Sequence, residues 1–235
     1  MKKFGCIVLL LSMAGAGASA ATSTAEQNRL REAATVLTDL RSTPEKGIPD
    51  QLWNKAACVI VIPSVKKAAF IFGGEYGKGV ASCRTANGWS APAFMELEKG
   101  SWGAQIGAEQ IDLVLLVMNR TGMDKLLDNK VSLGAGASVA AGPVGRAAGA
   151  STDGKLSAEI LSYSRSQGVF AGIDLAGGKL GPDKDANADV YGPAATAHQV
   201  VMDKSITAPA DTQVFLTALG APASVPAPAA TTGRD

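Results

Sequence analysis

The first regular pattern along the chain is a helical one, over Ser23–Arg41. Ser23 and Glu26, three residues apart, fit a capping box at the start of a helix. The pattern predicts an amphipathic helix that Pro44 ends, followed by a short second helix that begins near Pro49. The apolar residues of the first helix recur at intervals of three and four positions, at Leu30, Ala33, Ala34, Leu37 and Leu40.

From Cys58 onward the period changes to that of β-strands, with short apolar runs bounded by glycine, proline and asparagine. Pro63 is expected to stop the first run, and Asn87-Gly88 is a hairpin signal. Ile111–Asn119 is apolar on both faces, which predicts a central strand covered on both sides. About eight strands are expected in all. The predicted runs are Cys58–Ile62, Ala68–Phe72, Val80–Thr85, Trp89–Leu97, Gly103–Ala108, Ile111–Asn119, Val131–Val139, Leu156–Ser164 and Val169–Ala176.

A glycine-rich segment, Gly73 to Gly79, separates two of these predicted strands. Four glycines in seven residues indicate a backbone that makes positive-φ turns or that another group approaches closely. We interpret the segment as the connection of a hairpin between Ala68–Phe72 and Val80–Thr85. This hairpin places Lys78 at its tip, and it places Lys66, Lys67 and Arg84 near its open end.

Both ends of the chain are predicted to lie outside the folded domain. Lys2 and Lys3 precede a short apolar core, and Ala18-Ser19-Ala20 supplies the small residues of a cleavage site, so residues 1–20 have the pattern of an export signal. The apolar core is shorter than the stretch of about 20 residues that spans a bilayer. Residues 221–235 form an Ala/Pro-rich tail that we expect to be disordered. Residues 21–220 then form one domain, which a helix over Thr207–Leu219 closes.

The charge of the chain is nearly balanced. Its 22 Lys and Arg residues against 21 Asp and Glu residues give a net charge of +1, and removal of residues 1–20 leaves −1. Such a chain offers no general attraction for nucleic acid, so we expect no nucleic-acid partner and only local charged sites. Cys58 and Cys83 remain after cleavage. Export favours a disulfide between them, and two buried thiols are the alternative.

Residue patterns that carry catalysis or bind metal are missing from the sequence. It contains no Gly-x-Ser-x-Gly elbow, no P-loop and no His-Glu-x-x-His motif, and His198 is the one histidine. Asp183, Asp185, Asn187 and Asp189 match the first ligands of a calcium loop, but alanines replace its turn glycine and its bidentate glutamate. We therefore expect no enzymatic activity, no cofactor and no metal site.

Several longer motifs are specific when they are taken together. They are Gly73-Gly74-Glu75-Tyr76-Gly77-Lys78-Gly79, Trp89-Ser90-Ala91-Pro92, Gly103-Ala104-Gln105-Ile106-Gly107-Ala108, Asp112-Leu113-Val114-Leu115 with Met118-Asn119, Gly168-Val169-Phe170-Ala171-Gly172 and Tyr191-Gly192. In this order they resemble the SYLF family, a lipid-binding module that is also described as an actin-binding domain in fungal relatives. The resemblance covers most of the chain after the predicted export signal. It implies antiparallel β-structure flanked by helices, without known catalysis.

Together, pattern and resemblance predict a single-domain α+β protein. About eight mostly antiparallel strands are expected to form a twisted sheet or barrel-like core between N-terminal and C-terminal helices. The family links its eukaryotic members to phosphoinositides, membranes and actin. We expect an exported bacterial member to act in the periplasm or cell envelope, or as a secreted protein, where it meets neither phosphoinositides nor actin.

The expected partner is a phospholipid or membrane surface. Lys66, Lys67, Lys78 and Arg84 are the candidate contacts for a lipid headgroup, with Lys67 and Lys78 as the leading pair. Solvated charges on an edge hairpin are the alternative explanation for these residues. A structural or protein-interaction module of the envelope without a lipid ligand is the alternative function, and the sequence leaves its protein partner open.

Overall fold

The computed structural model describes residues 22–42, 47–69, 72–102, 107–142, 159–166, 169–170, 175–203 and 206–220. The predicted export signal, residues 1–20, and the predicted tail, residues 221–235, lie outside the described residues. So do most residues of the motifs at 103–108 and 168–172.

Helices flank the strands at both ends of the chain, as predicted. α1 (Thr24–Ser42) begins directly after Ser23, and α2 (Asp50–Lys55) begins after Pro49. The cap of α3 is Asn119, whose side chain accepts a hydrogen bond from the amide of Gly122. The remaining helices are α3 (Arg120–Asp128), α5 (Lys184–Tyr191), α6 (Ala197–Met202), the 3-10 helix η2 (Ala210–Thr212) and α7 (Gln213–Ala218).

The strands form one sheet in the order β6-β10-β4-β2-β1-β5-β8-β7, with β3 paired to β2 and β9 paired to β8. Every pair is antiparallel except β7–β8. The predicted α+β fold with mostly antiparallel strands is confirmed. The strands are β1 (Cys58–Ala69), β2 (Phe72–Thr85), β3 (Gly88–Trp89), β4 (Ala93–Trp102), β5 (Gly107–Val117), β6 (Val131–Ser132), β7 (Val139–Ala141), β8 (Ile160–Ser166), β9 (Val169–Phe170) and β10 (Lys179–Pro182).

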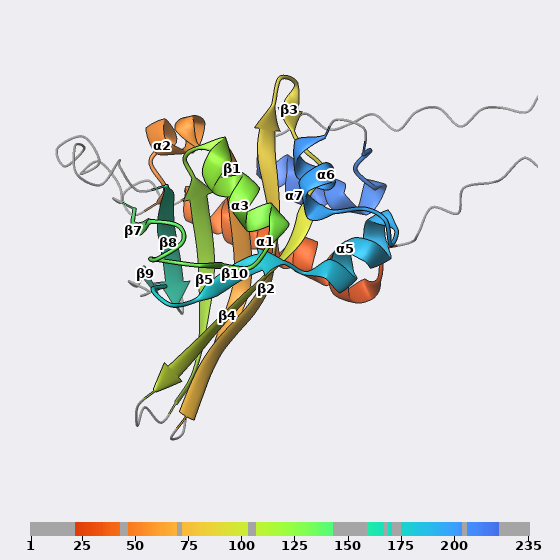
Figure 1. The fold of residues 1–235 in the computed structure, drawn as a ribbon. Helices are drawn as coiled ribbons and strands as arrows, with labels where there is room; N and C mark the ends of the chain where they lie inside the picture. Colours follow the sequence, from red (N-terminus) through yellow and green to blue (C-terminus); the bar gives the residue numbers. More distant parts are fainter. Residues whose placement is uncertain are drawn as a thin grey trace, which may run out of the picture.

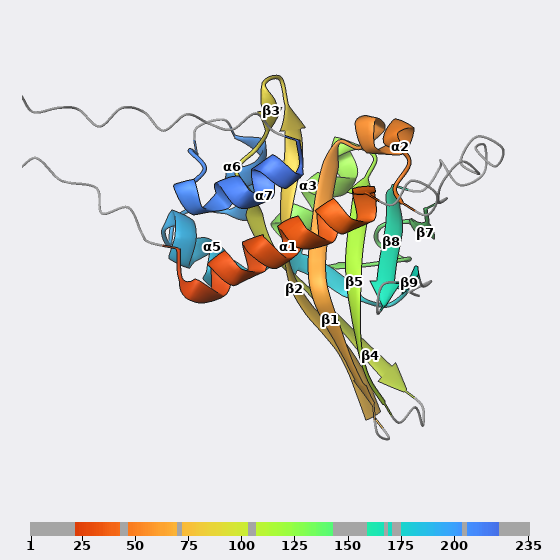
Figure 2. The same ribbon diagram turned by 180° about the vertical axis from the view of Figure 1, so that it is seen from behind.

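The sheet carries an apolar core on each face (Figures 1 and 2). α3 and α6 cover one face, and α1, α2, α5 and α7 cover the other. Residues of β1 divide between the two cores, with Cys58 and Ile60 in the first and Val59 and Val61 in the second. β5 lies inside the sheet, and Leu113–Val117 is fully buried, so the prediction of a central covered strand is confirmed.

The hairpin of β1 and β2 differs from the predicted one. β1 continues past Pro63, because an irregularity in register between Val61 and Lys66 accommodates this proline, which has no N–H to donate to the ladder. β2 runs without a break through the glycine-rich segment, and the connection between the strands follows Ala69. Lys78 therefore lies within a strand, opposite Glu96 of β4, and the prediction that it lies at a hairpin tip is wrong.

The glycines of β2 instead permit a close approach by β1. A Cβ atom at Gly79 would lie 2.1 Å from the carbonyl oxygen of Val61, and one at Gly77 would lie 2.6 Å from Cγ2 of Ile62. The bulged part of β1 therefore presses directly on β2, and any side chain at Gly79 would have to displace backbone atoms.

Two other predicted strands are divided by turns. Trp89–Leu97 separates into β3 and β4, with Pro92 between them. Val131–Val139 separates into β6 and the start of β7, because Gly134 turns the backbone at a φ of 89°. The alternation of small residues predicted a continuous strand there, and the structure shows a tight loop.

The far ends of β1, β2, β4 and β5 extend beyond the helices as a four-stranded projection, which we call the arm (Figures 1 and 2). It comprises residues 66–69, 72–76, 98–102 and 107–111. Pairing holds along its length, with Ala69 opposite both Gly73 and Gly107, and Phe72 opposite Trp102. β10 and β8 add strands only nearer the helices, so the arm is a narrower sheet than the body.

Candidate functional site

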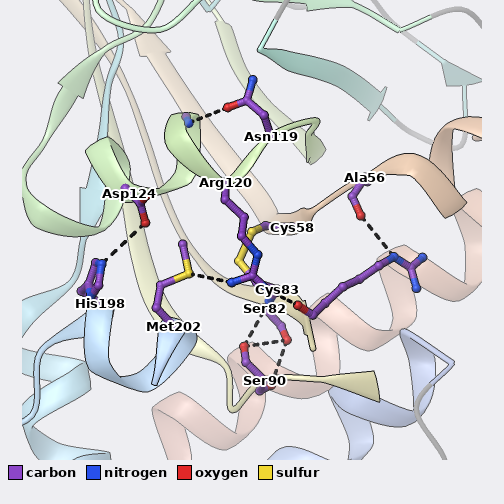
Figure 3. Close-up of a disulfide and its surroundings, with 12 residues drawn as sticks. Ala56, Cys58, Ser82, Cys83, Ser90, Asn119, Arg120, Asp124, His198 and Met202 are labelled. Atoms are coloured by element: carbon purple, nitrogen blue, oxygen red, sulfur yellow. Dashed lines mark hydrogen bonds and ion pairs between the residues drawn. A yellow bond between two sulfur atoms is a disulfide. The ribbon is translucent and has the colours of Figure 1, made fainter. Parts of the chain in front are cut away.

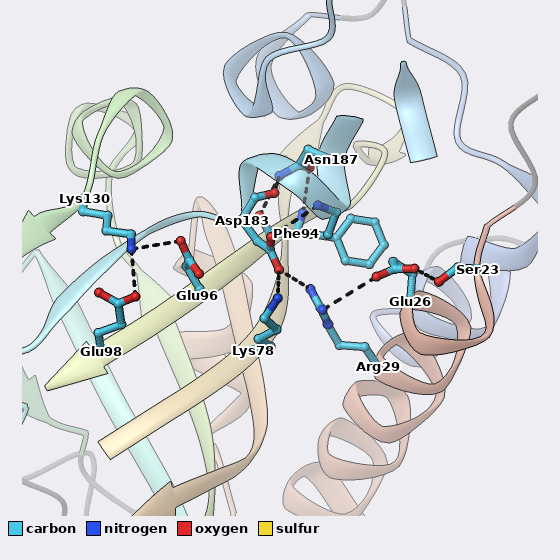
Figure 4. Close-up of polar contacts among 11 residues, drawn as sticks. Ser23, Glu26, Arg29, Lys78, Phe94, Glu96, Glu98, Lys130, Asp183 and Asn187 are labelled. Atoms are coloured by element: carbon cyan, nitrogen blue, oxygen red, sulfur yellow. Dashed lines mark hydrogen bonds and ion pairs between the residues drawn. The ribbon is translucent and has the colours of Figure 1, made fainter. Parts of the chain in front are cut away.

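A buried carboxylate, Asp183, holds two cations where α1 crosses the sheet (Figure 4). Its Oδ2 atom lies 2.8 Å from Nζ of Lys78 and 3.0 Å from a guanidinium nitrogen of Arg29. Lys78 comes from β2, Arg29 from α1 and Asp183 from the residue before α5. Three distant parts of the chain thus meet at one ion-pair cluster.

Asp183 is also a helix cap. Its Oδ1 atom accepts a hydrogen bond from the amide of Ala186, in the first turn of α5. Asn187, one turn later, accepts from the amide of Phe94 and donates to the carbonyl of the same residue, which fixes α5 against β4. These contacts explain two members of the acidic series that resembled a calcium loop. Among the described residues, no cluster of ligands suited to a metal ion is found.

The cluster sets the protonation of both partners. Burial alone would raise the pKa of Asp183, but the hydrogen bonds from Lys78 and from the amide of Ala186, together with the charge of Arg29, outweigh it and lower this pKa. The contact with Asp183 raises the pKa of Lys78. Both groups are therefore charged at neutral pH.

An open cleft of about 260 Å³ lies beside this cluster, lined by residues of α1 and by residues of β1 and β2 at the base of the arm. Tyr76 is opposite Lys66 in the β1–β2 register and two positions from Lys78, so all three lie on the face that α1 covers. Tyr76 is 42% exposed. The lining of the cleft is Ala25, Asn28, Arg29, Glu32, Pro63, Ser64, Lys66, Tyr76, Gly77 and Lys78.

A second, larger hollow of about 710 Å³ adjoins the first across Tyr76 and Lys78. The charged residues of its lining are three lysines and three carboxylates, Lys78, Lys130, Lys184, Glu96, Asp183 and Asp185. Lys130 is bound to Glu96 at 3.0 Å and to Glu98 at 2.9 Å (Figure 4). The hydrogen bonds from these two carboxylates raise the pKa of Lys130, so it stays protonated and paired. The second hollow is therefore close to neutral, and the available positive charge lies on the side of Lys66.

The structure separates the four residues that the sequence proposed as headgroup contacts. Lys66 and Lys78 line one cleft, although Lys78 is partly engaged by Asp183. The side chain of Lys67 lies outside the described residues. Arg84 is at the opposite end of β2 from the arm, where it donates to the carbonyls of Ala56 and Trp53.

The role of Arg84 is therefore a local structural one. Its guanidinium stacks on the ring of Trp89 at 4.4 Å from the centroid, and burial lowers its pKa. Arg84 was expected near the lysines because the hairpin turn was predicted within the glycine-rich segment, whereas the turn follows Ala69. Arg29, Tyr76 and Asp183 are the site residues that sequence reasoning missed. Tyr76 could have been identified from the sequence, because it is the aromatic residue of the glycine-rich motif.

Cys58 and Cys83 face each other across β1 and β2 and are joined by a disulfide (Figure 3). Both cysteines are fully buried. Next to the bridge, the hydroxyl of Ser90 accepts a hydrogen bond from the amide of Cys83. The disulfide therefore belongs to the core of the body and lies far along the sheet from the cleft.

His198 has a contact that accounts for its position. Its Nε2 atom lies 3.5 Å from a carboxylate oxygen of Asp124, which links α6 to α3 when the imidazole is protonated (Figure 3). Both side chains are substantially exposed. In the part of the chain that the structure describes, no helix combines the length and apolar character needed to cross a bilayer.

The sequence was compared with protein families and with curated proteins. The family model described as Ysc84, Las17-binding protein actin regulator, matches residues 98–221 of the 235-residue chain. An SH3 domain-containing protein of Schizosaccharomyces pombe is 37% identical over 60% of this chain and 34% of its own length.

Two further relatives cover more of the chain. LAS seventeen-binding protein 3 of Saccharomyces cerevisiae is 32% identical over 72% of this chain and 37% of its own length. SH3 domain-containing YSC84-like protein 1 of Bos taurus is 31% identical over 74% of this chain and 51% of its own length. The chain thus spans about a third to a half of the length of these curated relatives.

Proposed function

The chain belongs to the Ysc84/SYLF family, and from this premise we propose that it is a non-catalytic domain that binds phospholipid at a membrane surface. The observation that carries the proposal is the pairing of Lys66 with exposed Tyr76 at an open cleft beside Lys78. A cation next to an amphipathic ring suits the boundary between headgroups and acyl chains.

The charges around the cleft favour an anionic headgroup. Arg29 pairs with Asp183 and, at 3.8 Å, with Glu26, and Lys78 pairs with Asp183, whereas Lys66 is exposed and has no ion-pair partner among the described residues. Asp183 holds Lys78 and Arg29 in place, which leaves Lys66 as the cation with most freedom to meet a phosphate. A lysine near an anionic membrane contributes about 1 kcal/mol.

Sedimentation of the mature protein with vesicles tests this proposal. We expect binding to phosphatidylcholine vesicles that contain phosphatidylserine, weaker binding at high salt, and little binding to phosphatidylcholine alone. Lys66→Glu changes the local charge by two units and is expected to weaken binding to the anionic vesicles about tenfold or more.

Lys125→Glu is the matched control, since Lys125 is an exposed lysine of α3 on the other face of the sheet. An equal loss of binding in both variants would show that only net charge matters and would reject the cleft. Absence of binding to either kind of vesicle would reject membrane binding itself.

A protein-interaction module is the second candidate function. It is favoured by the description of the family model as an actin regulator and by the names of its LAS seventeen-binding relatives. Co-sedimentation of the purified domain with actin filaments tests it directly. Filament binding that Lys66→Glu leaves unchanged, together with no vesicle binding, would favour this function over the first.

We also propose that the domain has no catalytic activity and that it acts after export. We infer from residues 1–20 that the mature domain is exported and acts in the periplasm or cell envelope, or is secreted. Sequencing of the mature N-terminus is expected to begin at Ala21, and a retained Met1 would contradict export. Turnover in an esterase or phosphatase screen would contradict a purely binding role.

A further inference from the structure

The end of the arm has the composition of a surface that enters a lipid interface. We propose that this end, residues 68–69 of β1, 72–74 of β2, 100–102 of β4 and 107–108 of β5, inserts into the headgroup boundary of an anionic membrane. The inference rests on the proposed function and names the part of the molecule that penetrates. Lys66, at the base of the arm, then meets the phosphates.

The two hairpins of the arm have no charged residues near their ends. The sequence holds no charged residue from Ala68 to Gly74 and none from Gly100 to Ala108. Charged residues of both signs flank the two stretches on the side of the body, namely Lys66, Lys67, Glu75, Glu98, Lys99 and Glu109. The strand register brings the described ends of the two stretches to the same end of the sheet, and it places Lys67 opposite Glu75 and Glu109 and Lys99 opposite Glu75, so an uncharged end is bordered by a band that holds both signs of charge.

The register also places two aromatic residues together. Phe72 of β2 is opposite Trp102 of β4, and both lie close to the ends of their strands. Tryptophan and phenylalanine are enriched where proteins meet the interface between water and lipid. The arm extends past the helices of the body, so its end can reach a surface before the helices do (Figure 1). A projecting end suits a fluid layer better than it suits a folded partner that would need a matching groove.

Backbone pairing sets the depth of insertion. The inner strands β1 and β2 are paired on both sides to their ends, so their N–H and C=O groups need no water. In the described part of the chain, no strand pairs with the outer edge of β4 beyond Glu98 or of β5 before Asp112. Those edges need hydrogen bonds from water or headgroups, which confines the arm to the interface.

Distances along the strands agree with this depth. Lys66 and Tyr76 lie three positions from Ala69 and Gly73, which is about 10 Å along a strand. An interfacial element enters the headgroup and acyl boundary by about 5–10 Å. With the arm end inserted to that depth, Lys66 and the ring of Tyr76 lie at the level of the phosphates, where the proposed cleft binds them.

Quenching by brominated phosphatidylcholine in the anionic vesicles is the decisive measurement. The chain has three tryptophans, and Trp53 and Trp89 lie together at the end of the sheet opposite the arm, with ring centroids 6.0 Å apart. We expect quenching of the mature protein on binding. We expect Trp102→Phe to bind the vesicles normally and to lose the quenching. Quenching that persists in Trp102→Phe would overturn the inference, because it would place the opposite end in the lipid.

Removal of an apolar residue tests the same point without fluorescence. Phe72→Ser is expected to weaken vesicle binding about tenfold, whereas Val214→Ser, at an exposed residue of α7, is expected to leave it unchanged. Thermal melting checks that each variant folds. Equal binding by folded Phe72→Ser and by the parent protein would overturn the inference.

The outcomes separate the inference from the function on which it rests. Salt-sensitive binding without bromine quenching would leave membrane binding intact and reject insertion. No vesicle binding at all would reject the proposed function itself. A third outcome is a dimer of the mature protein that Phe72→Ser dissociates while vesicle binding is unchanged. That result would identify a second copy of the chain as the occupant of the arm end and would also overturn the inference.

Discussion

At the scale of single residues, Asp183 explains how the chain fixes two cations beside the cleft. Its carboxylate is buried and pairs with both Arg29 and Lys78. Arg29 also lies over the ring of Phe94, at 5.3 Å from the centroid. Removal of one partner from such a cluster leaves buried charge without compensation, so each member depends on the others.

Asp183→Asn should therefore destabilise the fold strongly. We expect the free energy of unfolding to fall by about 3 kcal/mol, because Arg29 and Lys78 lose the buried carboxylate that they share, while asparagine can still cap α5. Urea denaturation at neutral pH measures it. Asp185→Asn, at an exposed residue of the same helix, is the control and should change stability by less than about 0.5 kcal/mol. Similar losses in the two variants would contradict the central role of Asp183.

The same carboxylate predicts a dependence of stability on pH. The pKa of Asp183 in the folded protein lies below its ordinary value of 3.8, so the unfolded chain binds the proton more readily. The stabilisation is fully present well above pH 3.8 and is lost as the pH falls through the lower, folded-state pKa. In urea titrations, the stability difference between the parent and Asp183→Asn should stay constant at neutral pH and shrink in acid. A difference that grows in acid would contradict it.

Residue patterns alone found two of the five residues of the candidate site. Lys66 and Lys78 were identified from the sequence because they flank or lie within the glycine-rich motif. Arg29 and Asp183 were not, since their partners are 154 positions apart in sequence and no local pattern connects them. Arg84 was selected wrongly, because it is close to the glycine-rich motif in sequence but lies at the other end of β2 from the arm.

At the scale of elements, the contact between β1 and β2 determines the geometry of the site. The bulge at Pro63 keeps β1 in the sheet, and it presses Val61 and Ile62 on the glycines of β2. Because β2 then continues as a strand, Tyr76 and Lys78 lie on the same face as Lys66. Local sequence signals predicted a break at the proline and a turn at the glycines. Both residue types have these preferences, and strand pairing on both sides overrides them here.

A methyl group at Gly79 should disrupt this contact. Gly79→Ala places Cβ within 2.1 Å of the Val61 carbonyl oxygen, so we expect a loss of about 3 kcal/mol or more in the free energy of unfolding. Gly100→Ala, where no atom lies within 4 Å of the added methyl group, should be nearly neutral. Chemical denaturation of the two variants checks this, and a neutral Gly79→Ala would show that β1 and β2 are farther apart than described.

The disulfide constrains the same pair of strands at their other end. It connects cysteines 25 positions apart, for which the chain-entropy model gives about 3–4 kcal/mol of stabilisation. We expect Cys58→Ala with Cys83→Ala to lower stability by that amount in non-reducing buffer. Addition of a reductant should then affect the parent protein and not the variant. Equal stability of the two proteins before reduction would show that the bridge does not form in solution.

At the scale of the whole molecule, one sheet supplies both apolar cores. Neighbouring residues of β1 and β5 point alternately into the core under α1 and the core under α3. Neither core can therefore loosen while the shared strands stay packed in the other core. The sequence revealed this arrangement where a strand was apolar on both faces, as in Leu113–Val117. It did not reveal which helices cover which face, because that depends on contacts between distant segments.

Because the cores share their strands, the domain should unfold in a single cooperative transition. Leu37→Ala in α1 and Leu126→Ala in α3 each remove a fully buried side chain from opposite faces, and each should reduce stability by about 2–5 kcal/mol. The two losses should add in the double variant, since the sites share no contacts. In a Trp102→Phe background, tryptophan fluorescence follows α2 and β3 on the side of the α1 core, and far-UV circular dichroism follows the whole fold. Coincident transitions in every variant are expected, whereas a fluorescence transition that precedes the loss of circular dichroism would show that the α1 core melts by itself.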